Sequence, residues 1–97
     1  MSVRFEWVPA KNLSNIKKHR VSFEEASTVF LDENGLLIDD PDHSDEEDRF
    51  ILLGLSSTLL LLIVCHCSRS KVGVIRIISA QKADRQERQD YLRRFKS

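Results

Sequence analysis

Three polar side chains interrupt the most apolar part of this chain, and their residue types could support chemistry. His66 and Arg69 follow the run Leu59–Cys65, and Arg76 lies inside the run Val74–Ile78. An imidazole with a pKa near about 6.5 can exchange a proton around neutral pH, and a guanidinium can hold a phosphate through two parallel hydrogen bonds. Proton transfer and phosphate binding are therefore the chemistry that these interruptions suggest.

Each of these residues also has a structural explanation. A lone histidine in a strand is commonly a buried residue with a satisfied hydrogen bond. Arg76 must reach solvent or pair, so it could instead neutralise an acid such as Glu47 or Asp48 on a neighbouring strand. The residues by themselves leave both interpretations open.

Three short apolar runs must position these side chains. The runs Phe50–Leu55, Leu59–Cys65 and Val74–Ile78 are too short for typical helices, and polar joints separate them. They predict three consecutive antiparallel strands. The middle run is apolar on both faces, which favours the centre of the sheet.

The N-terminal third predicts a strand and two helices. Alternation over Val3–Trp7 indicates a strand, and Pro9 favours a helix that runs to about His19 and buries Leu13 and Ile16. A capping box at 22–25 begins the next helix. Its apolar stripe is typical of a core: Phe23, Ala26, Val29 and Phe30.

The remaining elements complete an α+β pattern. Leu36–Ile38 predicts a short strand, and Asp84 with Glu87 forms a capping box for a last helix. The residues available to dock that helix are Ala83, Tyr91, Leu92 and Phe95. The order β-α-α-β-β-β-β-α predicts a single domain over residues 1–97 with a mostly antiparallel sheet.

The net charge of zero hides a strong asymmetry. Residues 1–31 carry five basic and three acidic side chains, residues 32–48 carry none and nine, and residues 49–97 carry ten and three. The chain is therefore a basic body with an acidic segment. A basic surface favours phosphate-bearing partners, whereas the acidic segment could be solvated or could meet a basic partner.

The sequence favours neither a metal site nor a membrane. Alternation along a strand places His66 on the face opposite Cys65 and Cys67, so these three cannot bind one ion. A metal-sensing role through Cys65, His43 and the acidic segment is a third interpretation. No apolar run approaches the ~20 residues that span a bilayer, and no signal peptide is recognisable. We expect a cytoplasmic protein without a metal or cofactor.

The sequence also resembles the BrnT family of bacterial type II toxins along almost its whole length. The matching blocks occur in order: Phe5-Glu-Trp7, Lys11, Asn15, Lys18-His19, Val21–Ala26, Val29-Phe30, Asp40–Ser44, Glu47–Phe50, Gly54–Ser56, Val64–His66, Arg69, Ile75–Ala80, Lys82-Ala83, Glu87 and Tyr91. Two positions depart from the family: Val8 replaces a usual Asp, and Gln81 replaces a common Arg. The second departure removes one positive charge beside Lys82.

This resemblance implies a RelE-like fold and a ribonuclease that arrests translation. It also implies a BrnA-like antitoxin that neutralises the toxin and binds operator DNA, so that the toxin meets operator DNA only within the complex. Cleavage without a metal would use the ribose 2′-hydroxyl as nucleophile on the adjacent phosphate.

The resemblance further implies roles for individual residues. His66, Arg69 and Arg76 would be catalytic and would converge in one cationic hollow. The side chains of Lys11, Lys82, Arg85 and Tyr91 would contact RNA, although a core position explains Tyr91 more simply. The alternative function is a non-catalytic module that binds a DNA-binding antitoxin as co-repressor.

Overall fold

The computed structural model describes residues 3–39, 49–68 and 73–95. Along the chain the elements are β1 (Arg4–Glu6), α1 (Pro9–His19), α2 (Phe23–Thr28), the 3-10 turn η1 (Val29–Leu31), β2 (Leu36–Asp39), β3 (Arg49–Leu55), β4 (Leu61–Ser68), β5 (Val74–Lys82) and α3 (Arg85–Arg93). This order confirms the predicted α+β architecture. No helix within the described ranges has the length and apolar character needed to cross a membrane.

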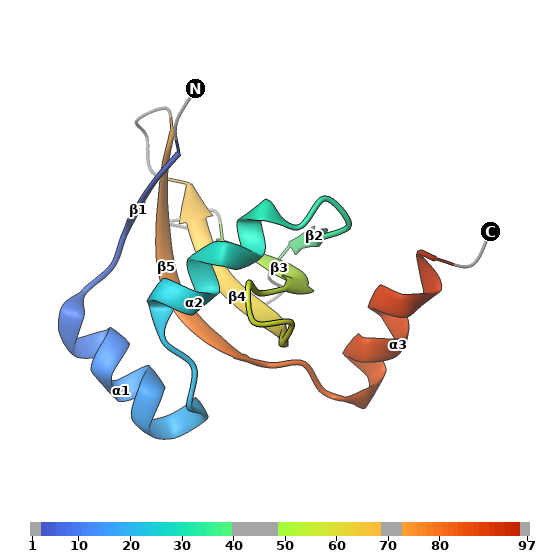
Figure 1. Ribbon diagram of the computed structural model, residues 1–97. Helices are drawn as coiled ribbons and strands as arrows, with labels where there is room; N and C mark the ends of the chain where they lie inside the picture. The colour runs from blue at the N-terminus through green and yellow to red at the C-terminus, as the bar shows by residue number, and fades with distance from the viewer. Residues whose placement is uncertain (1–2, 40–48, 69–72, 96–97) are drawn as a thin grey trace.

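The five strands form one sheet in the order β1-β5-β4-β3-β2 (Figure 1). β1 pairs with β5 in parallel, and the other neighbouring strands are antiparallel. The prediction that the second apolar run forms the central strand is confirmed. β5 extends beyond the predicted run, and β4 runs on to Ser68, so His66 lies inside β4 rather than at its end.

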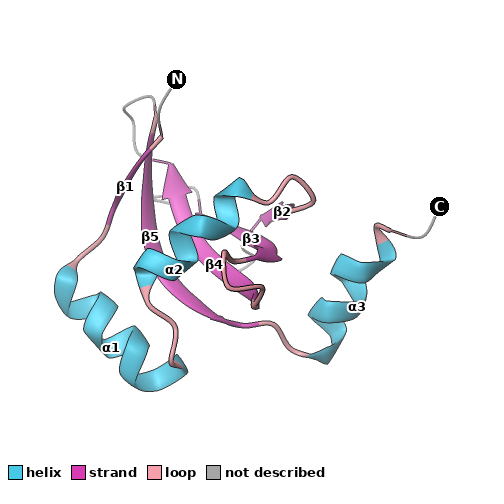
Figure 2. Cartoon of the chain, viewed as in Figure 1, coloured by secondary structure: helices cyan, strands magenta, loops and turns pink. Residues whose placement is uncertain are grey.

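One face of the sheet packs against α1 and α2, and we call it the helix-covered face (Figure 2). Its core combines the α2 stripe with strand residues, namely Val21, Phe23, Ala26, Val29, Leu52, Leu62, Val64, Ile77 and Ala80. The predicted cap is present, because Ser22 Oγ accepts a hydrogen bond from Glu25 N at 3.0 Å. The predicted stripe is core: Phe23, Ala26 and Val29 are buried, and Phe30 packs against them.

The opposite face is only partly covered, and we call it the open face. At one end α3 closes it with a second apolar cluster of Leu53, Leu61, Ala83 and Tyr91. The predicted capping box begins α3: Asp84 Oδ1 accepts from Glu87 N at 2.8 Å, and Glu87 Oε1 accepts from Asp84 N at 2.7 Å. The other two expected docking residues, Leu92 and Phe95, are exposed.

The expected apolar contact of α1 is wrong. Leu13 is 68% exposed and Ile16 is 38% exposed, whereas Asn12 and Asn15 are buried. Both asparagines are satisfied by hydrogen bonds to neighbouring elements, so their burial is not penalised. The bounds of α1 were predicted correctly, but the helix packs against its neighbours through Asn12 and Asn15, which we call its polar seam.

Candidate functional site

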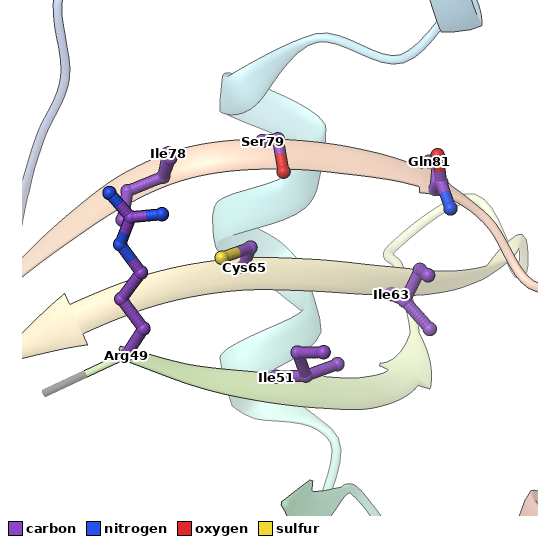
Figure 3. Close-up of a pocket in the computed structure, with 7 residues that line it drawn as sticks. All are labelled: Arg49, Ile51, Ile63, Cys65, Ile78, Ser79 and Gln81. Atoms are coloured by element: carbon purple, nitrogen blue, oxygen red, sulfur yellow. The ribbon is translucent and has the colours of Figure 1, made fainter. Parts of the chain in front are cut away.

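The open face contains a groove of about 300 Å³ beyond the end that α3 covers. Its lining residues come from the three central strands: Arg49, Ile51, Ile63, Cys65, Ile78, Ser79 and Gln81. In Figure 3 the groove is seen with α2 behind the sheet, and the Arg49 side chain extends from β3 across β4 towards β5. We call this feature the isoleucine groove, since three isoleucines form its walls.

A bulge in β5 shapes this groove. Ile77 and Ala80 lie in the core of the helix-covered face, whereas the two residues between them, Ile78 and Ser79, both line the groove. The register of β5 against β4 shifts at the same place, between Cys65 and His66. Such a bulge aims two successive side chains at one face.

Four residues form a row across the open face at one end of the groove. Arg49 of β3 pairs in register with Cys67 of β4, Cys67 pairs with Arg76 of β5, and Arg76 pairs with Glu6 of β1. Neighbouring strands lie about 4.8 Å apart, so the two arginines start from backbone positions roughly 10 Å apart on the same face. We call these four residues the arginine row. Two guanidinium groups can thus approach one anion from both sides.

His66 lies on the other face of the sheet. Its side chain is 5% exposed, its ring packs edge-on against Phe30 with centroids 4.8 Å apart, and Phe50 lies 6.2 Å away. Its Nδ1 is 3.1 Å from the carbonyl of Val64. Arg76 alternates with the buried Ile77 and so belongs to the open face. The expected convergence of His66 and Arg76 in one hollow is therefore wrong.

Burial lowers the pKa of His66 below its usual value of 6.5, although the hydrogen bond with the Val64 carbonyl partly opposes this effect. The unfolded chain then binds more protons than the folded chain as pH falls through about 6.5. Stability that is present above that pH is lost as the pH decreases.

We expect His66→Gln to flatten this pH dependence. Urea unfolding midpoints measured between about pH 5 and 8 should fall towards acid in the parent chain and change less in the variant. An unchanged slope in His66→Gln would mean that the imidazole titrates equally in both states.

The structure disperses the other predicted site residues. Lys11 is exposed on α1, and Lys82 pairs with Leu62 and so belongs to the helix-covered side. Arg85 is exposed at the start of α3. Arg69 lies outside the described residues, as do Glu47 and Asp48, the acids suggested as partners of Arg76. Of the predicted site residues that the structure describes, Arg76 alone lies beside the groove.

Tyr91 has the core position that the sequence also allowed. It is 3% exposed, and its hydroxyl donates a hydrogen bond to Asp32 Oδ2 at 2.7 Å. Burial, together with this bond and the charge of Asp32, raises the pKa of Tyr91 to about 12. Its ring is therefore hidden from a nucleobase, and its hydroxyl is a poor proton donor near neutral pH.

Asp32 is the acceptor that joins α3 to the sheet. Burial alone would raise its pKa, but hydrogen bonds from Leu55 N, the Tyr91 hydroxyl and Asn34 N outweigh burial, helped by the charge of Arg94. The net effect lowers the pKa of Asp32, so the carboxylate is ionised at neutral pH. The hydrogen bond between Tyr91 and Asp32 holds α3 over one end of the open face.

Sequence reasoning missed Arg49 and Glu6 as candidate site residues. Arg49 precedes an apolar run, and Glu6 belongs to a three-residue edge strand. Only the strand register places Glu6 next to Arg76 and places Arg49 in the same row, two strands away from Arg76. For Arg49 a signal was present, since it lies two residues before Ile51 and therefore on the same strand face, opposite the core residue Leu52.

The predicted alternation at the cysteines is confirmed. Cys65 lines the groove on the open face, whereas His66 is buried on the helix-covered face. Within the described ranges, no three His, Cys, Asp or Glu side chains gather as metal ligands would. Of the acidic segment, residues 40–48, including His43, lie outside those ranges, so a metal role for it stays a prediction.

Comparison with known proteins identifies the family. The crystal structure of the Brucella abortus ribonuclease toxin BrnT, at 1.1 Å resolution, matches with a TM-score of 0.63 and 19% sequence identity, covering 87% of this chain and 100% of that chain. At this identity the match shows a shared fold. Among curated proteins, no sequence matches.

A family model described as the ribonuclease toxin BrnT of type II toxin-antitoxin systems matches residues 7–87. Because that match spans most of the sequence, the chain belongs to the BrnT family of ribonuclease toxins.

Proposed function

We propose that this chain is a metal-independent endoribonuclease toxin that binds RNA on its open face and arrests translation. The observation that carries this proposal is the arginine row beside the groove. The ribose 2′-hydroxyl attacks the adjacent phosphorus, a 2′,3′-cyclic phosphate forms, and the 5′-oxygen leaves with a proton. Negative charge grows on the phosphoryl oxygens during this step, which is where guanidinium groups stabilise the transition state most.

The proposal assigns phosphate binding to Arg49 and Arg76. They lie on strands separated only by β4, and both point to the open face according to the register. Strands are rigid supports, so the two cations need little reorganisation when the substrate binds. Exposed cations elsewhere, such as Lys11 and Arg85, add salt-dependent attraction for the RNA backbone.

Glu6 is the proposed proton acceptor for the 2′-hydroxyl, since it is the register neighbour of Arg76 on the same face. We expect Glu6→Gln to lower the rate of RNA cleavage by roughly 10²-fold or more, because an amide cannot take up the proton. Initial rates of RNA cleavage should be measured for both proteins under the same conditions. Glu24→Gln, at an exposed position on α2, is the matched control. If Glu6→Gln weakens folding but leaves the rate unchanged, Glu6 only pairs with a cation.

We further propose a BrnA-like antitoxin as the partner, encoded by the adjacent reading frame. Membership of a type II family implies an antitoxin. In this proposal the antitoxin carries the DNA-binding part, so operator DNA is bound only by the complex. The RNA substrate places the activity in the cytoplasm.

The test uses the purified chain and a defined RNA in buffer containing EDTA. Cleavage products ending in a 2′,3′-cyclic phosphate and a 5′-hydroxyl are expected, together with growth arrest when the chain is expressed without its antitoxin. Intact RNA, or cleavage that requires an added divalent cation, would contradict the proposed function.

One observation favours a second function, a non-catalytic toxin-like module that acts as co-repressor. Among the described residues, the side chains that line the groove include no carboxylate, histidine or lysine. If operator repression persists in the Arg49→Gln/Arg76→Gln variant and the parent chain cleaves no RNA, the second function is correct.

A further inference from the structure

We propose that the isoleucine groove is the anchoring site for a segment of the antitoxin, which inserts aliphatic side chains into the groove and places a carboxylate on the arginine row. The inference rests on the proposed function, because it takes the arginine row to be the RNA phosphate site. The antitoxin would then inhibit the toxin by occupying that phosphate site. Its affinity would come from apolar contacts with the isoleucine groove, which RNA does not make.

The walls of the groove favour an aliphatic occupant. Ile51, Ile63 and Ile78 come from three neighbouring strands, and the half-buried Cys65 lies between them. Ile63 also packs against the cluster under α3, so one wall of the groove is continuous with the core. A volume of about 300 Å³ accommodates more than one aliphatic side chain. Burying such apolar surface on both partners is the main source of affinity at protein interfaces.

RNA fits this groove less well. Single-stranded nucleic acids gain affinity by stacking bases on aromatic rings, and the lining side chains that the structure describes include no aromatic ring. Ser79 and Gln81 could bond to a base edge, but an extended peptide also offers backbone partners for both.

The two guanidinium groups of the arginine row favour an acidic segment on the side away from Glu6. Of the lining residues within the described ranges, Arg49 is the charged one, and Arg76 lies two strands away in the same row. A carboxylate can accept two parallel hydrogen bonds from a guanidinium, as a phosphate does. The arginine row is thus shared by RNA and antitoxin, whereas the groove belongs to the antitoxin alone.

The experiment separates these two parts with the variant Ile51→Thr/Ile78→Thr. Threonine retains the branched side chain that strands favour but removes apolar surface from the groove. Binding is measured with the antitoxin obtained from the adjacent reading frame, and cleavage is measured with a defined RNA. We expect antitoxin affinity to fall about a hundredfold while the cleavage rate of the free toxin is unchanged. Leu37→Thr, at an exposed apolar position on the other face of β2, should alter neither.

If the double variant folds poorly, alkylation of Cys65 in the unaltered chain provides a second test. Cys65 should be protected from iodoacetamide in the antitoxin complex and should stay reactive when RNA is bound. Full antitoxin affinity in a folded double variant, or no protection of Cys65, would overturn the inference. Loss of cleavage together with binding would assign the groove to RNA instead. If the parent chain cleaves no RNA, the proposed function fails, while the binding measurements still decide whether the antitoxin uses the groove.

Discussion

Replacing Arg76 by glutamine is expected to lower kcat/KM for RNA cleavage by about 10²- to 10³-fold, the usual cost of removing one preorganised donor for transition-state charge. Glutamine retains length and a hydrogen-bond donor but has neither the charge nor the forked geometry. The loss should fall mainly on kcat, because the charge on the phosphoryl oxygens grows only as the 2′-hydroxyl attacks. Initial rates on a defined RNA, with substrate concentration varied, measure both parameters.

Two further variants decide how Arg76 acts. Arg76→Lys keeps the charge but loses bidentate geometry, so its rate should lie between those of the parent and Arg76→Gln. Arg93→Gln is the matched control, since the Arg93 side chain is 69% exposed on α3, at 3.6 Å from Asp90. Equal losses in Arg76→Gln and Arg93→Gln would indicate general attraction for RNA rather than a phosphate site.

A double-mutant cycle tests whether Arg49 and Arg76 hold the same phosphate. If they do, the effects of Arg49→Gln and Arg76→Gln on the activation free energy should not add, because either substitution alone disrupts the shared site. Additive effects would place the two guanidinium groups on separate phosphates. Unfolding temperatures of all variants should be compared, since Arg76 is half-buried.

Much of the fold could be predicted because it is encoded locally. The run lengths predicted the strands, and the capping residues Ser22 and Asp84 predicted where two helices begin. The order of elements followed from these signals. The apolar character of the middle strand on both faces predicted its central place, since such a strand must be covered on both sides.

The candidate site was harder to predict, because it depends on register. The order of residues along the chain showed that His66 and Arg76 interrupt apolar runs. It did not show that the two side chains point to opposite faces of the sheet. A bulge at Ile78 and Ser79 reverses the alternation along β5, and no local pattern marks it. The arginine row also needs the parallel pairing of β1 with β5, a contact between the two ends of the chain.

The polar seam of α1 escaped prediction for a different physical reason. Helical periodicity assumes that apolar residues face the core, so it selected Leu13 and Ile16. A buried asparagine is nevertheless favourable when its amide replaces a missing backbone partner. Within the described part of the chain, β1 pairs with β5 over residues 74–76, so no described strand lies beside Ala80 further along the same edge.

The Asn15 amide supplies that partner. Its Nδ2 donates to the Ala80 carbonyl at 2.7 Å, and its Oδ1 accepts from Ala80 N at 3.2 Å, much as an adjacent strand would. Nδ2 also donates to the Val21 carbonyl at 2.9 Å. One side chain therefore joins α1, the start of α2 and the edge of β5.

We expect Asn15→Ala to lower the free energy of unfolding by about 3 kcal/mol, since it leaves buried backbone groups of Ala80 and Val21 unpaired and opens a cavity. Urea unfolding followed by circular dichroism measures the change, and the slope with denaturant should stay constant. Asn34→Ala, at an exposed turn, is the matched control and should cost less than about 0.5 kcal/mol.

Asn15→Asp separates the hydrogen bonds from the cavity. The aspartate has nearly the same shape but no amide donor, so it faces the carbonyls of Ala80 and Val21 with oxygen atoms only. It should therefore destabilise the chain at neutral pH at least as much as alanine does, and part of that loss should be recovered at acid pH, when the carboxyl can donate. If Asn15→Asp is as stable as the parent chain, the hydrogen bonds to Ala80 and Val21 do not hold α1 on the sheet.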